Sequence, residues 1–303
     1  MAFAPFLIVI SGILTCLQAP AIAPNQILAR GLQSVPLEQA LQSVRAGDVV
    51  VLGEEHGTTV LPGQQLQVMQ ALRQKGLKVS VGMEFFDETQ QGFVDDWRAG
   101  ILPEAEFLKA IHWKGFPFDS YRGQAQFPKV GESFTIALNA PMSLTGKIAK
   151  TGIAGLSAED RAMLPPNFTV GNAAYFERFK NVMGGESHLP SPQALQNYFE
   201  AQSTWDDVMA FNATQFLKAH PEQVLVIVVG EFHVQYGGGL PDRLKARGET
   251  SMAVTTFSLL NLNGLSEVEQ HQAVEPDVKD GIRADFVWTS NFANGTSAPI
   301  SIQ

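Results

Sequence analysis

Two stretches of the sequence decide the expected fold: residues 47–57 read GDVVVLGEEHG, and residues 223–234 read QVLVIVVGEFHV. Each is an apolar run that ends in Gly-Glu-x-His. Continuous Val, Ile and Leu runs, as opposed to alternating ones, are typical of strands covered on both faces, as in a parallel sheet. The sequence therefore predicts two buried strands, far apart in the chain, that end in the same signature.

Other apolar runs alternate with helical patterns along the chain. Strands are expected at Asp48–Gly53, Lys78–Phe85, Phe134–Leu138, Val224–Gly230 and Met252–Ser258, with a weaker one at Ala284–Trp288, and helices at Pro62–Lys75 and Asp206–His220. This alternation predicts an α/β fold with a mostly parallel central sheet flanked by helices. Residues 148–216 carry no convincing strand, but they contain helix starts at Ser157 and Ser191, so we expect a helical insertion or lid there.

Length and charge narrow the class of protein. With 303 residues and 45% hydrophobic residues, the chain is long enough for one large core, which we place in a domain at 34–290. The formal net charge is −9 and no cluster of Lys and Arg stands out, which argues against a nucleic-acid partner.

The first 23 residues resemble an export signal. Residues 3–15, FAPFLIVISGILT, form an uncharged apolar segment of signal length, followed by Cys16, the only cysteine. The sequence predicts lipidation of Cys16, with cleavage after Ala23 as the alternative. Either processing implies export to the cell envelope, and the first implies a lipid anchor in a membrane. Residues 24–33 are expected to be a linker and residues 291–303 a flexible tail.

The repeated signature predicts a functional site. The carboxyl ends of parallel strands meet at one edge of the sheet, where clefts form. Residues two apart in an extended backbone point the same way, so Glu54 and His56 form one co-facing pair and Glu231 and His233 another. The strand at 78–85 brings Glu84 to the same edge. We therefore expect two imidazoles and three carboxylates to converge there.

The residues alone leave the chemistry of this cluster open. His56, His233 and Glu84 suit a divalent metal ion, while Glu54 or Glu231 suits a general base. An organic ligand is equally compatible, and an isolated His more often has a purely structural role. A tyrosine can ligate ferric iron, and Tyr236, three residues after His233, is the best placed. Ordinary packing is the alternative for Tyr121, Tyr175 and Tyr198.

Several further motifs resemble one known family. They are LGEEH at 52–56, Gln67, GMEFF at 82–86, Gln90-Gln91, Trp97-x-x-Gly100, Tyr121-Arg122, ALNAP at 137–141, GIAGLSAEDRAMLP at 152–165, AQSTWDDVMA at 201–210 and VGEFHVQYGGGLPDRL at 229–244. In this order, over about residues 34–260, they resemble the haem-binding uptake proteins of the ChaN family in the TIKI superfamily, which are often lipid-anchored.

The resemblance implies a haem ligand and a homodimer in which two haems stack face to face. It places Glu54, His56, Glu84 and His233 at the haem site. A tyrosine is expected to ligate each iron, with Tyr236 preferred and Tyr175 second. Gln64 stands where many relatives have a His, which removes one possible ligand.

The same superfamily also implies competing functions. Its metalloprotease-like members and the similar erythromycin-esterase-like proteins use paired Gly-x-x-His motifs for hydrolysis. In that interpretation His56, His233 and Glu84 hold a metal, and Glu54, Glu84 or Glu231 takes part in catalysis. A scaffold lipoprotein with a relict pocket is the third possibility.

Overall fold

The computed structural model describes residues 22–58, 60–184 and 191–292. The expected signal segment with Cys16, and all of the expected tail beyond residue 292, lie outside the described residues.

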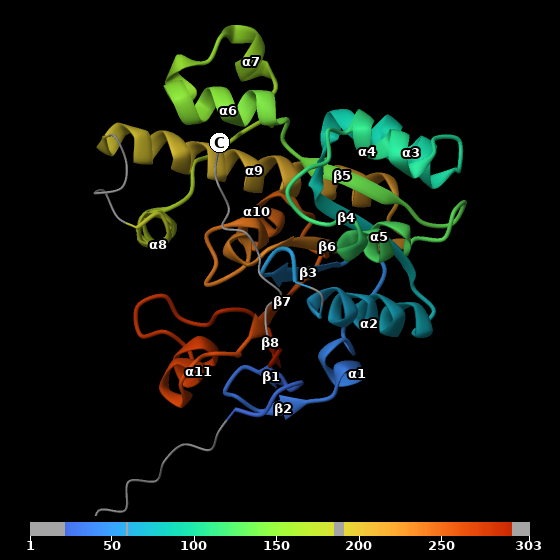
Figure 1. The fold of residues 1–303 in the computed structure, drawn as a ribbon, viewed down its shortest axis with the longest axis vertical. Helices are drawn as coiled ribbons and strands as arrows, with labels where there is room; N and C mark the ends of the chain where they lie inside the picture. The colour runs from blue at the N-terminus through green and yellow to red at the C-terminus, as the bar shows by residue number, and fades with distance from the viewer. Residues whose placement is uncertain (1–21, 59, 185–190, 293–303) are drawn as a thin grey trace, which may run out of the picture.

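The described strands form one mixed, mostly parallel sheet with the order β2-β1-β8-β7-β3-β6-β4-β5 (Figure 1). The strands are β1 (Ile27–Ala29), β2 (Ser34–Val35), β3 (Val49–Glu54), β4 (Lys78–Asp87), β5 (Thr135–Asn139), β6 (Gln223–Gly230), β7 (Val254–Asn261) and β8 (Phe286–Ser290). Strands β3 to β8 pair in parallel, and β1 pairs antiparallel with β2 and β8. The expected α/β class and all six expected strands are confirmed.

The helices cover both faces of the sheet. They are α1 (Leu37–Ala40), α2 (Leu61–Gln74), α3 (Gln91–Arg98), α4 (Glu104–Ala110), α5 (Asp119–Gln126), α6 (Met142–Thr151), α7 (Ala158–Ala162), α8 (Ala173–Val182), α9 (Pro192–Ala219), α10 (Leu240–Arg247) and α11 (Glu267–Val274). Short 3₁₀ turns are η1 (Glu88–Gln90), η2 (Ile153–Gly155) and η4 (Glu231–His233).

Successive side chains of the central strands point to opposite faces of the sheet, and each face has its own hydrophobic core. On β3, Val50 and Leu52 pack with Val68 and Met69 of α2 on one face. The neighbouring Val51 packs on the opposite face with α9 and α10. Because successive side chains of a strand point to opposite faces, an unbroken apolar run is what a doubly covered strand requires.

The described part of residues 148–216, where we expect a helical insertion or lid, carries helices and no strand. It belongs to the α6–α9 connection that leads from edge strand β5 back to β6. Ser157 and Ser191 cap α7 and α9 as their sequence patterns predict. The second half of α9 packs directly on the sheet through Met209, Ala210 and Ala213, because its apolar stripe continues past the expected boundary.

The expected linker at 24–33 needs correction. Ile27 and Leu28 are buried in β1, which pairs with Trp288 and Val287 of β8. The strand is only three residues long, so it gives no periodic signal, and its pairing with β8 comes from the other end of the chain.

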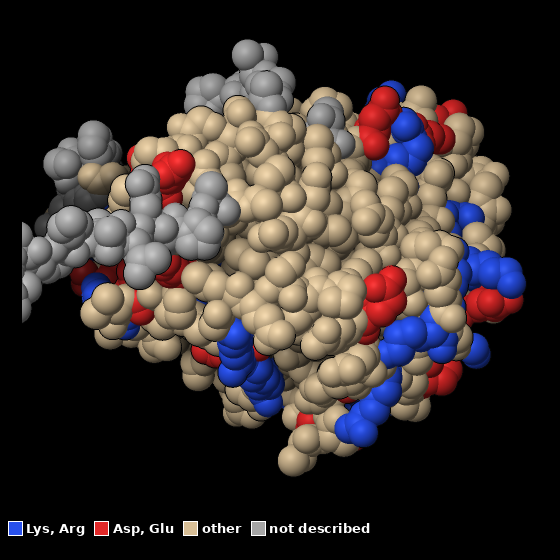
Figure 2. All heavy atoms as spheres, turned by 90° about the horizontal axis from the view of Figure 1, so that it is seen from below, with Lys and Arg blue, Asp and Glu red and all other residues tan. Residues whose placement is uncertain are grey.

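Two features of the described residues bear on membrane and nucleic-acid partners. Across residues 22–58, 60–184 and 191–292, no helix has both the length and the apolar character needed to cross a membrane. On the face in Figure 2, Lys and Arg side chains are interspersed with Asp and Glu around the rim, and the centre is neutral.

Candidate functional site at the carboxyl edge of the sheet

The two Gly-Glu-x-His signatures meet where β3 and β6 end side by side. Glu54 is aligned with Gly230 in the parallel register, and β4, on the other side of β6, carries Glu84 to the same edge. The glycine of each signature lies against a side chain of the other signature. An added Cβ at Gly230 would lie 2.7 Å from Nε2 of His56, and one at Gly53 would lie 2.6 Å from Oε2 of Glu231. Each motif therefore needs its glycine because the other motif packs against it.

Glu84 lies between the two histidines. Its Oε1 is 3.3 Å from Nε2 of His233, and its Oε2 is 3.7 Å from Nε2 of His56. The same Oε2 accepts a 2.6 Å hydrogen bond from the backbone N–H of Gly230. The expected convergence of His56, His233 and Glu84 is thus present.

His233 is held from its other side by residues of α9. Its Nδ1 is 2.7 Å from Oδ1 of Asp206, which has no exposed surface. The hydroxyl of Tyr175 donates to Oδ2 of Asp206 at 2.9 Å. The amide Nε2 of Gln202 lies 3.1 Å from Nδ1 of His233 and 3.2 Å from the hydroxyl of Tyr175. Both ring nitrogens of His233 therefore contact carboxylates.

A second buried network holds His56. Oε1 of Glu54 accepts from the hydroxyl of Tyr121 at 2.8 Å and lies 3.2 Å from Nδ1 of His56. Oε2 of Glu54 accepts from Gln65 at 3.0 Å, and Gln65 in turn accepts from Gln124 at 2.7 Å. The two networks join at Glu84 into one chain, Asp206–His233–Glu84–His56–Glu54.

Charge pairing decides the protonation of this chain. Burial by itself lowers the pKa of His233, but Asp206 and Glu84 outweigh it and raise the pKa to about 10. Burial raises the pKa of Glu84, and the two imidazoles reverse this, bringing it to about 2. Burial lowers the pKa of His56, but Glu84 and Glu54 outweigh burial, so the pKa is raised above its ordinary value. At neutral pH His233 is therefore an imidazolium and Glu84 a carboxylate.

Glu231 does not join this cluster, contrary to the expectation from strand alternation. Strand β6 ends at Gly230 and residues 231–233 form the 3₁₀ turn η4, so the two-residue period no longer applies. Oε1 of Glu231 instead accepts from Ser258 at 2.6 Å and from Arg283 at 3.0 Å. Burial raises the pKa of Glu231, partly offset by Arg283 and Ser258.

The tyrosines differ in the freedom of their hydroxyl groups. Tyr175 and Tyr121 are fully buried, and both hydroxyls are bonded within the networks. Burial and the adjacent carboxylates, Asp206 and Glu54 respectively, raise the pKa of both phenols far above the ordinary value. Tyr236 is half-buried, and its hydroxyl bonds to nothing among the described residues. Its backbone is left-handed, with φ of 60°, which is unusual for an aromatic residue.

Two guanidinium groups flank Tyr236. The guanidinium carbon of Arg283 lies 4.9 Å from the ring centroid, and that of Arg178 lies 5.9 Å away. Arg283 donates through Nε and Nη1 to Ala273, Glu231 and Gln235, while its Nη2 has no partner among the described residues. Arg178 is tied to Asp280 and to the carbonyl of Gly237, and its buried Nε has no partner.

The sequence reasoning missed Asp206, Gln202, Gln65 and the hydrogen-bonding role of Tyr121. The signal for Asp206 was present as two adjacent acids, Asp206-Asp207, inside an apolar helical stretch. Because both are nearly fully buried, each needs a charged partner, and these are His233 and Arg247.

The carboxylates on either side of His233 are Asp206 at Nδ1 and Glu84 at Nε2. Within the described ranges, no three His, Cys, Asp or Glu side chains are grouped as metal ligands.

The family described as haem-binding uptake, Tiki superfamily, ChaN matches residues 40–244. The chain belongs to this family. Its ChaN-type fold is also similar to a solved structure that describes cofacial haem binding to ChaN of Campylobacter jejuni. That structure is 18% identical with a TM-score of 0.62, over 86% of this chain and 95% of that chain.

A mutant erythromycin esterase, EreC, in its open conformation, is 9% identical with a TM-score of 0.50, over 88% of this chain and 95% of that chain. At these identities, both likenesses show the fold alone. No curated protein matches the sequence.

Proposed function

We propose that this protein binds haem for iron uptake and that Tyr236 ligates the ferric iron. The observation that carries the proposal is the half-buried phenol of Tyr236, which has no hydrogen bond within the described residues and lies between Arg283 and Arg178. Phenolate oxygen is an established haem ligand. Tyr175 is less suited, because its hydroxyl is sealed in the interior and donates to Asp206.

The surroundings of Tyr236 fit the rest of the haem. Haem carries two propionate carboxylates, and the free Nη2 of Arg283 supplies a charge-assisted donor beside the ring. Apolar side chains for the porphyrin face lie just before Arg283 in the chain, since Ile282 is 38% exposed and Val278 is fully exposed. In this account His56, Glu84, His233 and Glu54 do not ligate iron. They form the ion-paired frame that fixes η4 and the loop that carries Tyr236.

The apolar surface around this site supports a homodimer. Leu265, Val268, Val278 and Ile282 are exposed within one stretch of the chain, which runs from just before α11 to the segment after it. Exposed apolar groups concentrated in this way mark protein interfaces. We propose that a second copy covers this surface, and that a lipid on Cys16 holds the exported dimer at a membrane, as the sequence indicates.

The test is a titration of haemin into the mature protein, followed by absorbance, with sedimentation measured in parallel. Saturation at one haem per chain, together with dimer formation, supports the proposal. Haemin dimethyl ester, in which both propionates are blocked, is expected to bind more weakly. A protein that does not perturb the haemin spectrum would contradict the proposal.

A second candidate is a hydrolase without metal. The observation that favours it is that His56 is more exposed than His233, has its Nδ1 held by Glu54, and lies beside Phe85 and Phe116. Its raised pKa suits a general acid. In that case hydrolysis of an aryl ester would be lost in His56→Gln, retained in Tyr236→Phe and insensitive to chelators. The haem proposal instead makes Tyr236 the residue whose substitution abolishes function.

A further inference from the structure

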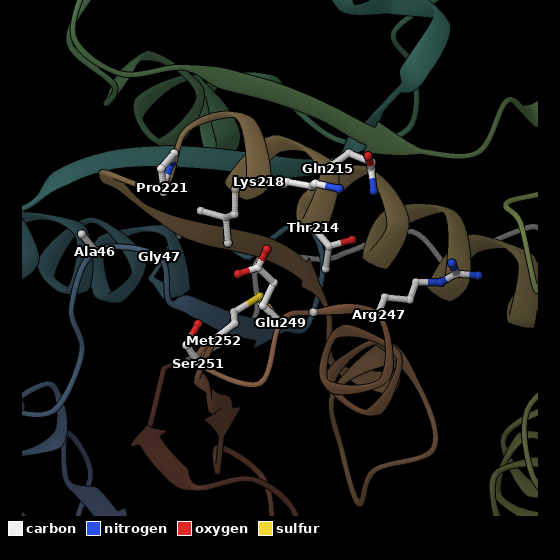
Figure 3. A pocket seen from close by; sticks show the side chains of 12 residues that line it. Ala46, Gly47, Thr214, Gln215, Lys218, Pro221, Arg247, Glu249, Ser251 and Met252 are labelled. Atoms are coloured by element: carbon white, nitrogen blue, oxygen red, sulfur yellow. The ribbon is translucent and has the colours of Figure 1, made fainter.

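One cavity lies at the amino edge of the sheet, at the opposite end of the strands from the His–Glu chain. Its volume is about 350 Å³. It is enclosed by the turn before β3, by the end of α9 with the connection to β6, and by the turn between α10 and β7 (Figure 3). This size falls at the lower end of the range for small-molecule sites.

The two walls of this cavity carry opposite charges. Lys218 and Gln215 come from α9 on one wall, and Glu249 comes from the α10–β7 turn on the other (Figure 3). Lys218 and Glu249 are exposed, and neither side chain forms a hydrogen bond or ion pair with another described residue. By contrast Arg247, the other charged lining residue, is committed to the buried Asp207 through Nε at 2.8 Å and Nη2 at 2.5 Å.

The backbone around the cavity adds to the preference for a cation on the Glu249 side. Helix α10 ends on this side, at Arg247, whereas α9 ends at Ala219 on the other wall, where the charge of Lys218 must outweigh the partial negative charge of the helix end. The carboxyl ends of helices carry partial negative charge and favour cations. Between the charged walls the lining includes the apolar Ala46, Leu217, Pro221 and Met252 beside Thr214 and Ser251. Met252 packs so closely on Gly248 that an added Cβ there would lie 2.2 Å from its terminal methyl carbon.

We propose that this cavity binds a small zwitterion of dipeptide size, with its carboxylate at Lys218 and Gln215 and its ammonium group at Glu249. The apolar lining takes the side chain between them. The site is separate from the proposed haem site, since the two lie at opposite edges of the sheet.

The probe is the dipeptide glycyl-leucine, added to the haem-free full-length mature protein and followed by amide NMR at Gly47, Gly248 and Ser251. We expect saturable shifts with a dissociation constant on the order of 1 mM. N-acetyl-glycyl-leucine, which lacks the ammonium group, and glycyl-leucinamide, which lacks the carboxylate, are each expected to bind about fivefold more weakly, the scale of one exposed ion pair.

Two variants assign each charge to its wall. Lys218→Met is expected to abolish the preference for the dipeptide over its amide and to keep the preference over the acetylated form. Glu249→Gln is expected to do the reverse. Lys245→Met and Glu159→Gln, exposed residues outside the cavity, are matched controls that keep both preferences. Equal binding of all three probes to the wild type, or no shifts at the cavity, would overturn the proposal whatever the outcome of the haemin titration.

Discussion

Asp206 of α9 and His233 of η4 are joined by a contact of 2.7 Å between Oδ1 and Nδ1, and both side chains are buried. In Asp206→Asn the imidazolium loses its nearest counter-charge. The pKa of His233 is therefore expected to fall well below its present value of about 10, and the free energy of unfolding to decrease by roughly 3 kcal/mol. Urea denaturation and an NMR titration of His233 measure the two effects.

The matched control is Asp119→Asn, whose side chain is 79% exposed and pairs with Arg122 on the surface. Its effect on the free energy of unfolding is expected to stay within about 0.5 kcal/mol. A His233 that titrates identically in Asp206→Asn and the wild type would show that the contact does not set its charge.

The raised pKa of His233 also predicts how stability depends on pH. The folded state binds its proton more tightly than the unfolded state, whose ordinary pKa is 6.5. The stabilisation is complete below pH 6.5 and is lost as pH rises towards 10, with a slope of at most about 1.4 kcal/mol per pH unit. Denaturation of the wild type and of His233→Gln between pH 6 and 10 tests this, because the slope must be smaller in the variant, where only other groups such as His56 still contribute.

How far the sequence predicts this structure depends on what each residue contacts. The unbroken apolar runs of β3 and β6 correctly predict a parallel sheet. Because the carboxyl ends of parallel strands share one edge of the sheet, they also correctly predict that His56, Glu84 and His233 lie together. The position of Glu231 was wrong, because the backbone leaves the strand at Gly230. The partners Asp206 and Gln65 come from helices, and no periodicity in the sequence indicates which buried polar group meets which. Nothing local in the chain reveals that β1 pairs with β8.

Glu84 is predicted to set the charge of both histidines at once. In Glu84→Gln the amide can still accept from the N–H of Gly230, but the negative charge is lost. The pKa of His56 and of His233 should each fall by about one unit or more, because both are raised by this carboxylate. Glu55→Gln is the control, since Glu55 is exposed beside the same cluster and neither pKa should move. If only one histidine responds, Glu84 does not bridge the two.

The glycine of the second signature is predicted to be essential for packing. In Gly230→Ala the new Cβ would lie 2.7 Å from Nε2 of His56, so the imidazole must move. The expected loss is about 1–3 kcal/mol in the free energy of unfolding, with a changed His56 resonance. In Gly146→Ala on α6 the Cβ meets nothing within 4 Å, and a gain of about 0.5–1 kcal/mol is expected. Equal effects of the two changes would argue against the reciprocal packing.

The central claim is that Tyr236 ligates haem iron, and haemin titration of Tyr236→Phe beside Tyr198→Phe and Tyr175→Phe tests it most directly. Wild type, Tyr198→Phe and Tyr175→Phe are expected to give the same visible spectrum of phenolate-ligated ferric haem. Tyr236→Phe is expected to lose that spectrum and to bind haemin at least about tenfold more weakly. A Tyr236→Phe protein that keeps the wild-type spectrum and affinity would contradict the account.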